Sequence, residues 1–205
     1  MKLYYLPGAC PLASHIALIW AGENHELQAV ARDELKQAPF LALNPAGAVP
    51  VLEDGDFILT QSSAILEYIA ERNPHSGLLP DDLRARAEVR RWLAFCNADL
   101  HRTFALLFAA PRYVGSEAAQ AELIEGASRM LVDLFAIAER QLEGREWIAG
   151  SRSIADPYLY TLLRWAQFKQ VPLDGMDNLK AFFARMEADP GVQAALVAEG
   201  LQAPR

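Results

Sequence analysis

The first 72 residues alternate short strand-like segments with amphipathic helical ones. Apolar and β-branched side chains predict strands at residues 2–6, 26–30, 49–53 and 57–60, and helices at 11–21 and 62–72. The triplet Asp54-Gly55-Asp56 is typical of a hairpin turn, and Gly22 is typical of a helix end. The order of strand, helix, strand, then two strands and a helix predicts a small α/β sandwich.

The remainder of the chain has helical periodicity. Apolar residues recur close to every 3.6 positions through 84–110, and further helices are expected at 118–142, 153–168, 179–187 and 192–198. Residues 73–82 contain two prolines, a glycine and paired aspartates, which is typical of a linker. We therefore predict an α/β domain over residues 1–76 and an all-α helical domain over residues 84–205.

Composition narrows the class of protein. The 205 residues carry a net charge of −7 without a basic stripe, so we expect no nucleic-acid partner. No apolar run approaches the ~18–20 residues of a membrane span, and the chain opens directly on a strand-like segment, so we expect neither a membrane anchor nor a signal peptide. Two cysteines make no disulfide framework, which favours a cytoplasmic location.

Cys10 is the first candidate for chemistry. It follows a turn and precedes Pro11, a residue suited to the first turn of a helix, so its sulfur is predicted at a helix N-terminus that favours a thiolate. The alternative is a small buried apolar residue. Ala13 stands where a second cysteine would complete a Cys-x-x-Cys motif, which disfavours two-cysteine redox cycling within the chain.

Two further segments have the character of a peptide-binding edge. A cis bond before Pro50 would present the backbone of Val49 to an extended peptide, whereas an ordinary trans proline at a strand edge is the alternative. After Gln61, Ser62 is predicted to cap a helix whose N–H groups can also hold a carboxylate.

A narrow polar and small-residue stripe follows one side of the helix predicted at 84–110. It contains Asn97 and His101 among alanines at positions 94, 98 and 105, which indicates either a cleft wall or tight helix packing. Cys96 lies on the bulky apolar stripe and is predicted to be inert core. Ser153 and Asp156 have the spacing of a structural capping box. The other histidines show no metal-ligand spacing, so we expect no metal.

Five segments taken in order resemble the glutathione transferases, and most closely their bacterial beta class. They are residues 1–16 including Cys10, then 44–52, 61–65, 147–150 and 153–156. The resemblance covers essentially the whole chain. It implies a thioredoxin-like N-terminal domain, a helical C-terminal domain, a homodimer and a role in detoxification.

The resemblance also implies roles for single residues. Cys10, His101 and Tyr5 become the catalytic candidates. The glutathione-binding candidates are Lys36, Val49, Pro50 (cis), Gln61, Ser62, Asn97 and Arg102. Two of these depart from the family pattern: Asn97 would replace an asparagine that is Ala94 here, and Arg102 stands where lysine is usual.

These residues imply a transferase that joins the thiolate of its co-substrate glutathione to a small electrophile. The electrophile is expected against Ala105, Phe108, Tyr113, Trp165 and Phe168. Cys10 adds a second chemistry, thiol–disulfide exchange or peroxide reduction through a mixed disulfide. The alternative from another class is a non-catalytic binding or assembly module with the same fold.

Overall fold

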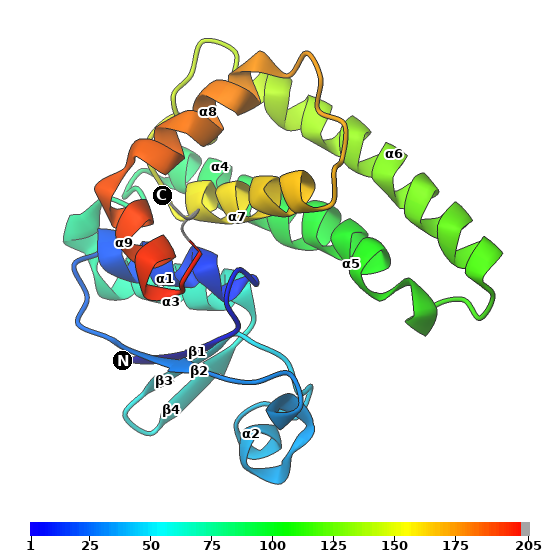
Figure 1. The fold of residues 1–205 in the computed structure, drawn as a ribbon. Coiled ribbons are helices and arrows are strands. Elements are labelled where there is room, and N and C mark those ends of the chain that lie inside the picture. The colour runs from blue at the N-terminus through cyan, green and yellow to red at the C-terminus, as the bar shows by residue number, and fades with distance from the viewer. Residues whose placement is uncertain (202–205) are drawn as a thin grey trace.

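A four-stranded mixed sheet forms the lower part of the molecule in the computed structural model, which describes residues 1–201 (Figure 1). The strands are β1 (Lys2–Tyr5), β2 (Glu26–Ala29), β3 (Val51–Asp54) and β4 (Phe57–Thr60). Their order is β2-β1-β3-β4, with β1 parallel to β2 and antiparallel to β3, which in turn is antiparallel to β4. The predicted α/β arrangement is confirmed.

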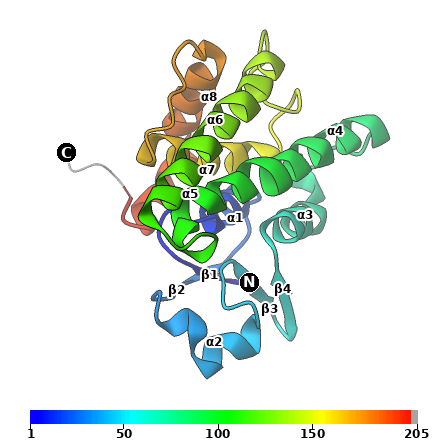
Figure 2. The same ribbon diagram turned by 90° about the vertical axis from the view of Figure 1, so that its right-hand side faces the viewer.

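Helices cover both faces of the sheet. Neighbouring strand residues point to opposite sides, so each face carries apolar side chains that need a partner. Leu52 packs into the main core with α1 (Pro11–Trp20) and α3 (Ser62–Arg72), whereas the adjacent Val51 packs with Phe40 of α2 (Ala38–Leu43). Figure 2 shows α2 on the side of the sheet away from the other helices. The sheet therefore turns its α1 and α3 face toward the rest of the chain.

The remainder of the chain is helical. Its longer helices are α4 (Leu83–Ala94), α5 (His101–Ala109), α6 (Glu117–Gln141), α7 (Ala155–Phe168), α8 (Asp177–Ala188) and α9 (Pro190–Ala198). The most deeply buried of them is α7, which packs against α1 and α4. One continuous core therefore joins the sheet-bearing part to the helical part. Residues 1–201 contain no helix that is both long enough and apolar enough to cross a bilayer.

One prediction of local structure is wrong, and two segments without a predicted helix contain short helical turns. The single helix expected over 84–110 is divided by a π-helical turn, Phe95–Leu100, which widens the helix and shifts the phase of its faces. The segment between β2 and β3, for which no element was predicted, contains the short helices Glu34–Lys36 and α2. The linker contains a 3₁₀ turn, Pro74–Ser76, and is held in place by buried leucines at 78 and 79.

The Asp156 half of the capping box predicted before α7 is confirmed, although Ile154 and not Ser153 takes the N-cap position. The fully buried Asp156 carboxylate accepts hydrogen bonds from the Ser153 amide at 2.7 Å, the Ser153 hydroxyl at 3.0 Å and the Ile148 amide at 3.0 Å. One side chain thus ties the loop before α7 to the start of the helix that supports the whole core.

Replacing Asp156 with alanine would leave these three donors buried without an acceptor. We expect Asp156→Ala to lower the free energy of unfolding by about 3–5 kcal/mol. Urea unfolding followed by tryptophan fluorescence measures the change. Ser116→Ala is the control, because Ser116 caps the exposed start of α6 with one hydrogen bond from Ala119, and its loss costs ~1 kcal/mol. Equal effects of the two variants would contradict this assignment.

Candidate functional site

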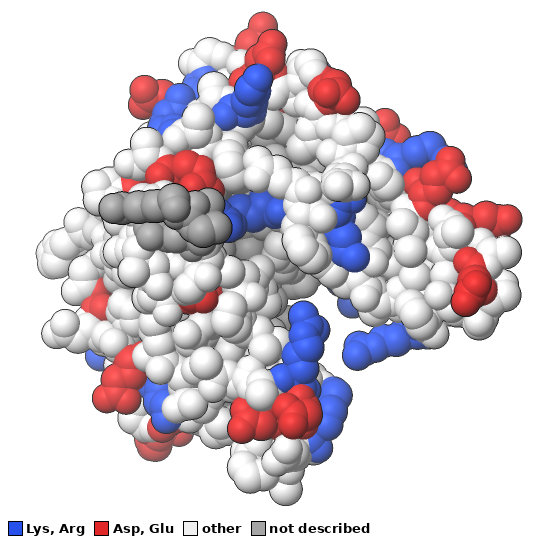
Figure 3. Space-filling model, viewed as in Figure 1, with Lys and Arg blue, Asp and Glu red and all other residues white. Residues whose placement is uncertain are grey.

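A cavity of about 520 Å³ lies where the sheet-bearing part meets the helical part. The segment 6–10 forms one wall, and α5 and α7 form the other through His101, Phe108 and Trp165. Trp165 Nε1 donates a hydrogen bond to the Gly8 carbonyl at 2.8 Å, which joins the two walls. In the space-filling view the surface is hollowed near the middle of the molecule (Figure 3). A cavity of this size is typical of small-molecule sites.

Cys10 lies at the N-cap of α1 and lines this cavity, as predicted, but its thiol is not activated. The side chain is 8% exposed, with Sγ 3.5 Å from the Val49 carbonyl oxygen, to which the thiol donates. Burial raises the pKa of the Cys10 thiol to about 11, although a hydrogen bond with Ser62 acts in the opposite direction. The expectation of a thiolate favoured by the helix N-terminus is wrong for the free protein.

The reason lies in the first turn of α1. Pro11 has no N–H, and the next two amides are already committed, because Leu12 donates to Ala9 at 3.1 Å and Ala13 donates to the Cys10 carbonyl at 3.2 Å. The Cys10 amide and the Ser62 hydroxyl still lower the pKa of the thiol, but the next two amides of the turn are used elsewhere and desolvation has the larger effect.

The segment before Pro50 is held in a fixed shape. The Val49–Pro50 peptide is cis, as the resemblance implies. Asn44 and Lys36 brace the preceding turn, since Asn44 Nδ2 donates to the Ala48 carbonyl at 2.5 Å and Lys36 Nζ donates to the Ala46 carbonyl at 2.9 Å. Gly47 has φ +58°, and a Cβ there would lie 2.6 Å from the Leu35 carbonyl oxygen, so this position requires glycine.

The start of α3 lies close to the Cys10 sulfur. Gln61, not Ser62, takes the N-cap position, with φ 74°, and no side chain caps the helix there, so the predicted capping role of Ser62 is wrong. Ser62 is instead the first helical residue and is 4% exposed. Its hydroxyl lowers the pKa values of both Cys10 and Tyr158 through hydrogen bonding, which places it between the two.

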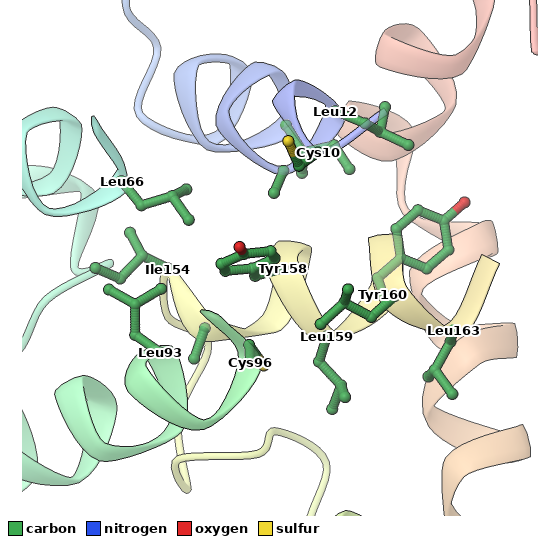
Figure 4. Packing of buried hydrophobic residues seen from close by; sticks show 14 of the residues in the cluster. Cys10, Leu12, Leu66, Leu93, Cys96, Ile154, Tyr158, Leu159, Tyr160 and Leu163 are labelled. Atoms are coloured by element: carbon green, nitrogen blue, oxygen red, sulfur yellow. The ribbon is translucent and has the colours of Figure 1, made fainter. Parts of the chain in front are cut away.

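Tyr158 connects the polar residues of the predicted stripe. Its hydroxyl donates to Asn97 Oδ1 at 3.0 Å and lies 2.7 Å from His101 Nδ1. Because that single proton is given to Asn97, Tyr158 accepts from His101 Nδ1–H, and Nε2 of the neutral imidazole remains an acceptor. Figure 4 shows Tyr158 between α1, which carries Cys10, and the helix that carries Cys96.

His101 is neutral at physiological pH. Burial, and next the charge of the exposed neighbour Arg102, lower the pKa of His101 to about 4. His101 lines the cavity, but the alanines at 94 and 98 are exposed, since the π turn breaks the predicted stripe. Tyr5 is 8% exposed, and burial followed by the charge of Glu199 raises its pKa.

The other side chains divide between core and cavity. Cys96 is fully buried, and desolvation raises its pKa strongly, in agreement with a place in the core. Of the side chains expected against the electrophile, Phe108, Trp165 and Phe168 line the cavity, whereas those at 105 and 113 are not among its lining residues. Residues 1–201 bring no three His, Cys, Asp or Glu side chains together as metal ligands.

Sequence reasoning missed Tyr158, Arg32 and Arg164. Tyr158 lies within the helix after the capping box, where no spacing indicates that it contacts Asn97 and His101 some sixty positions earlier. Arg32 and Arg164 line the cavity from a loop and from α7. For Arg164, a charge within an apolar helical segment was the available signal, whereas Arg32 is followed by Asp33 and Glu34 and gave none.

The raised pKa of Cys10 makes its reactivity depend steeply on pH. In the ligand-free protein, we expect alkylation of Cys10 by iodoacetamide to accelerate about tenfold per pH unit from pH 7 to 9, because the thiolate fraction rises by that factor below the pKa. Mass spectrometry of the labelled peptide measures the rate, with Cys10→Ser as the control for labelling elsewhere. A plateau at pH 8 would show a stabilised thiolate instead.

Comparison with known proteins agrees with the geometry. Residues 1–71 match the glutathione S-transferase N-terminal domain, and residues 99–190 match the glutathione S-transferase C-terminal domain. Glutathione S-transferase GST-4.5 of Xanthomonas campestris pv. campestris is 48% identical over 203 residues, which is 98% of this chain and 100% of that protein.

Solved structures show the same likeness. A sphingomonad glutathione S-transferase complexed with glutathione has a TM-score of 0.86 at 36% identity, covering 98% of this chain and 100% of its own. The bacterial beta class glutathione S-transferase of Sphingomonas chungbukensis has a TM-score of 0.87 at 35% identity, covering the same shares. With its thioredoxin-like sheet domain and its helical domain, the chain belongs to the glutathione S-transferase family and is similar to the bacterial beta class.

Proposed function

We propose that the protein is a glutathione transferase, an enzyme that joins the sulfur of glutathione to small electrophiles. The observation that carries this proposal is the position of the Cys10 sulfur, 3.5 Å from the Val49 carbonyl, on one wall of a cavity that His101 closes from the other part of the chain. A relative 36% identical to this chain was solved with glutathione bound, which supports the same ligand here.

In this proposal the tripeptide lies extended along the braced segment before Pro50. The backbone of Val49 pairs with the cysteinyl unit, as an added strand would. Gln61 and the buried Ser62 receive the γ-glutamyl end at the N-terminus of α3, where free N–H groups favour a carboxylate. Lys36 stands at the same segment and is assigned to the glycine carboxylate.

The remaining assigned residues act through their neighbours. Asn97 is hydrogen-bonded to Tyr158 and therefore positions that hydroxyl. Arg102 is exposed beside His101, and its charge helps to keep the imidazole neutral. Tyr5 is buried under the site, so we assign it to support of the cavity wall.

The difference between the pKa values of His101 and of a thiol limits the role of His101. A free thiol has a pKa of ~8.5 and His101 has one of about 4, so complete proton transfer from glutathione to the imidazole would cost about 6 kcal/mol. His101 is therefore a hydrogen-bonding group for the sulfur, and the thiol proton leaves to solvent. The resulting thiolate forms a carbon–sulfur bond with the electrophile, whose leaving group departs with the electron pair of the bond that breaks.

The hydrogen bonds that link Asn97, Tyr158 and His101 determine whether Nε2 of the imidazole is a donor or an acceptor. As the hydrogen bonds stand, Nε2 is an acceptor, which suits the neutral thiol. Once the thiol has ionised, the sulfur needs a donor. When the imidazole loses its Nδ1 proton to solvent and gains one from solvent at Nε2, the Tyr158 hydroxyl turns to donate to Nδ1, and Nε2–H supplies that donor. Tyr158 is thus a positioning residue that acts through His101.

The pKa of Cys10 favours conjugation over exchange as the main activity. At pH 7 a thiol with a pKa of about 11 is ionised in about one molecule in ten thousand. Disulfide exchange would require that thiolate to attack the glutathione sulfur of a mixed disulfide between glutathione and a substrate thiol, so that Cys10 takes up the glutathionyl group and the substrate thiolate is released. A glutathione thiolate would then attack the mixed disulfide on Cys10 to give glutathione disulfide and free Cys10. We assign this chemistry, with peroxide reduction, as a slower side activity.

The setting follows from the same proposal. We infer that the protein works in the cytoplasm as a homodimer, and that its biological role is detoxification. A non-catalytic assembly module is the second candidate, but Cys10 and His101 both line an open cavity, which favours turnover.

The variant Cys10→Ala separates these activities. We expect it to bind glutathione with measurable heat and to conjugate 1-chloro-2,4-dinitrobenzene within about threefold of the wild type, since the reacting sulfur belongs to glutathione. Disulfide exchange should fall at least tenfold. Titration calorimetry and steady-state kinetics measure the three quantities.

Each alternative gives a different result. An assembly module would show neither heat of glutathione binding nor turnover in the wild type. Retained exchange activity in Cys10→Ala would eliminate the mixed-disulfide route. Loss of conjugation with binding unchanged would make Cys10 a catalytic residue for conjugation as well.

Removing the Tyr158 hydroxyl tests its positioning role. We expect Tyr158→Phe to lower kcat/KM about tenfold and to raise the pH midpoint of kcat/KM by about one unit, because the thiolate loses an oriented donor. Tyr68→Phe is the matched control, since it deletes a 2.7 Å hydrogen bond to Asp54 elsewhere in the sheet-bearing part. A purely structural role would reduce the melting temperature and leave the pH midpoint where it was.

A further inference from the structure

The cavity beside Cys10 is cationic in a protein that is acidic as a whole. Two arginines, Arg32 and Arg164, line it, and no Asp or Glu does so among residues 1–201. The chain carries 26 acidic against 19 basic residues, so the average surface would favour the opposite sign. Lys and Arg side chains gather around the hollow at the centre of Figure 3. This local concentration of positive charge attracts an anion.

The Arg32 side chain has no ion-pair partner within reach among residues 1–201. Its side chain is exposed in the loop after β2 and makes no ion pair or hydrogen bond with any of residues 1–201. The carboxylate of nearby Glu34 is turned back onto its own loop, where it accepts from the Ala31 amide at 2.7 Å. Arg164, by contrast, lies 2.8 Å from Glu187, which neutralises much of its charge. Arg32 is therefore the stronger attractor of an anion in the cavity.

Aromatic rings form the facing wall. The Trp165 ring, fixed by its hydrogen bond to Gly8, packs edge-on against Phe108 with their centroids 5.2 Å apart. Phe108 is 45% exposed and Phe168 is 76% exposed, an unusual degree for rings that line a cavity. Lys169 Nζ lies 4.7 Å from the Phe108 centroid and adds positive charge at this edge. The wall suits a planar aromatic ring with an anionic substituent.

The tripeptide itself does not account for these features. Val49, Gln61 and Ser62, which would hold glutathione, are absent from the cavity lining, whereas Cys10 and His101 belong to it. Lys36 lies at the segment before Pro50 and is available for the glycine carboxylate. The cavity is thus the space on the far side of the reacting sulfur, where the second substrate must be.

Resting on the proposed transferase function, we propose that the second substrate is an aromatic electrophile bearing a carboxylate. Its ring lies against Phe108 and Phe168, and its carboxylate pairs with Arg32. A suitable probe is 4-chloro-3,5-dinitrobenzoate. The glutathione sulfur bonds to the ring carbon that carries chlorine, chloride leaves with the electron pair of that bond, and the thiol proton passes to solvent.

Paired substrates and variants test this assignment in the full-length protein. The acid is compared with its uncharged carboxamide, 4-chloro-3,5-dinitrobenzamide, each rate being divided by the uncatalysed rate with glutathione. We expect the wild type to prefer the acid, and Arg32→Gln to lower kcat/KM for the acid about tenfold while changing the amide less than twofold. Arg129→Gln is the control, because Arg129 is an exposed arginine paired with Glu125 on α6, away from the cavity.

The outcomes separate the inference from the function on which it rests. If neither probe is conjugated while glutathione also fails to bind, the transferase function itself is wrong. Conjugation of both probes without a preference for the acid would overturn the carboxylate assignment alone. An equal loss for acid and amide in Arg32→Gln, with a raised KM for glutathione, would assign Arg32 to the tripeptide and overturn it as well.

Discussion

The packing of α1 against α7 is the contact on which the rest of the site depends. It places the Cys10 end of α1 opposite Tyr158, at the point where the sheet-bearing part meets the helical part. Neither part forms the cavity alone. The sheet-bearing part supplies Cys10, and the helical part supplies the imidazole of His101 and the aromatic wall. The hydrogen bonds of Asp156 fix where α7 begins. They thereby fix the position of Tyr158, which is two residues further along the helix.

Desolvation is the dominant electrostatic effect at this contact. It raises the pKa of Cys10 and lowers that of His101, so both side chains are uncharged near pH 7 before a ligand arrives. Two neutral groups avoid the cost of burying charge that no partner compensates. In the proposed function, the negative sulfur of glutathione is then the charge that the site must stabilise, and the hydrogen bonds of Ser62 and Tyr158 are available beside Cys10.

The sequence was sufficient for features that depend on neighbours along the chain. The strands, the hairpin at Gly55, the Asp156 half of the capping box before α7 and the placement of Cys10 at the start of a helix follow from local patterns, and the structure confirms them. The π turn was not predictable, because one added residue in a helical turn leaves the apolar periodicity nearly unchanged. The phase shift it introduces moves Ala94 and Ala98 out of the stripe that contains His101.

The pKa values, hydrogen bonds and charge of the site were less predictable than the residues that form it. They arise from contacts between residues that are distant in the sequence. A helix N-terminus lowers a thiol pKa only as far as its N–H groups reach the sulfur. Here the Cys10 amide does so, whereas Pro11 has no N–H and the amides of Leu12 and Ala13 are used elsewhere, so burial dominates. Tyr158 joins Asn97 and His101 through a fold-level contact that no spacing encodes. The cationic lining has the same origin, since Arg32 and Arg164 lie more than a hundred positions apart and meet only across the cavity. Residue types in a sequence thus indicate candidate reacting groups, whereas the environment that tunes their pKa values, and the charge that lines the cavity, depend on which helices the fold brings together.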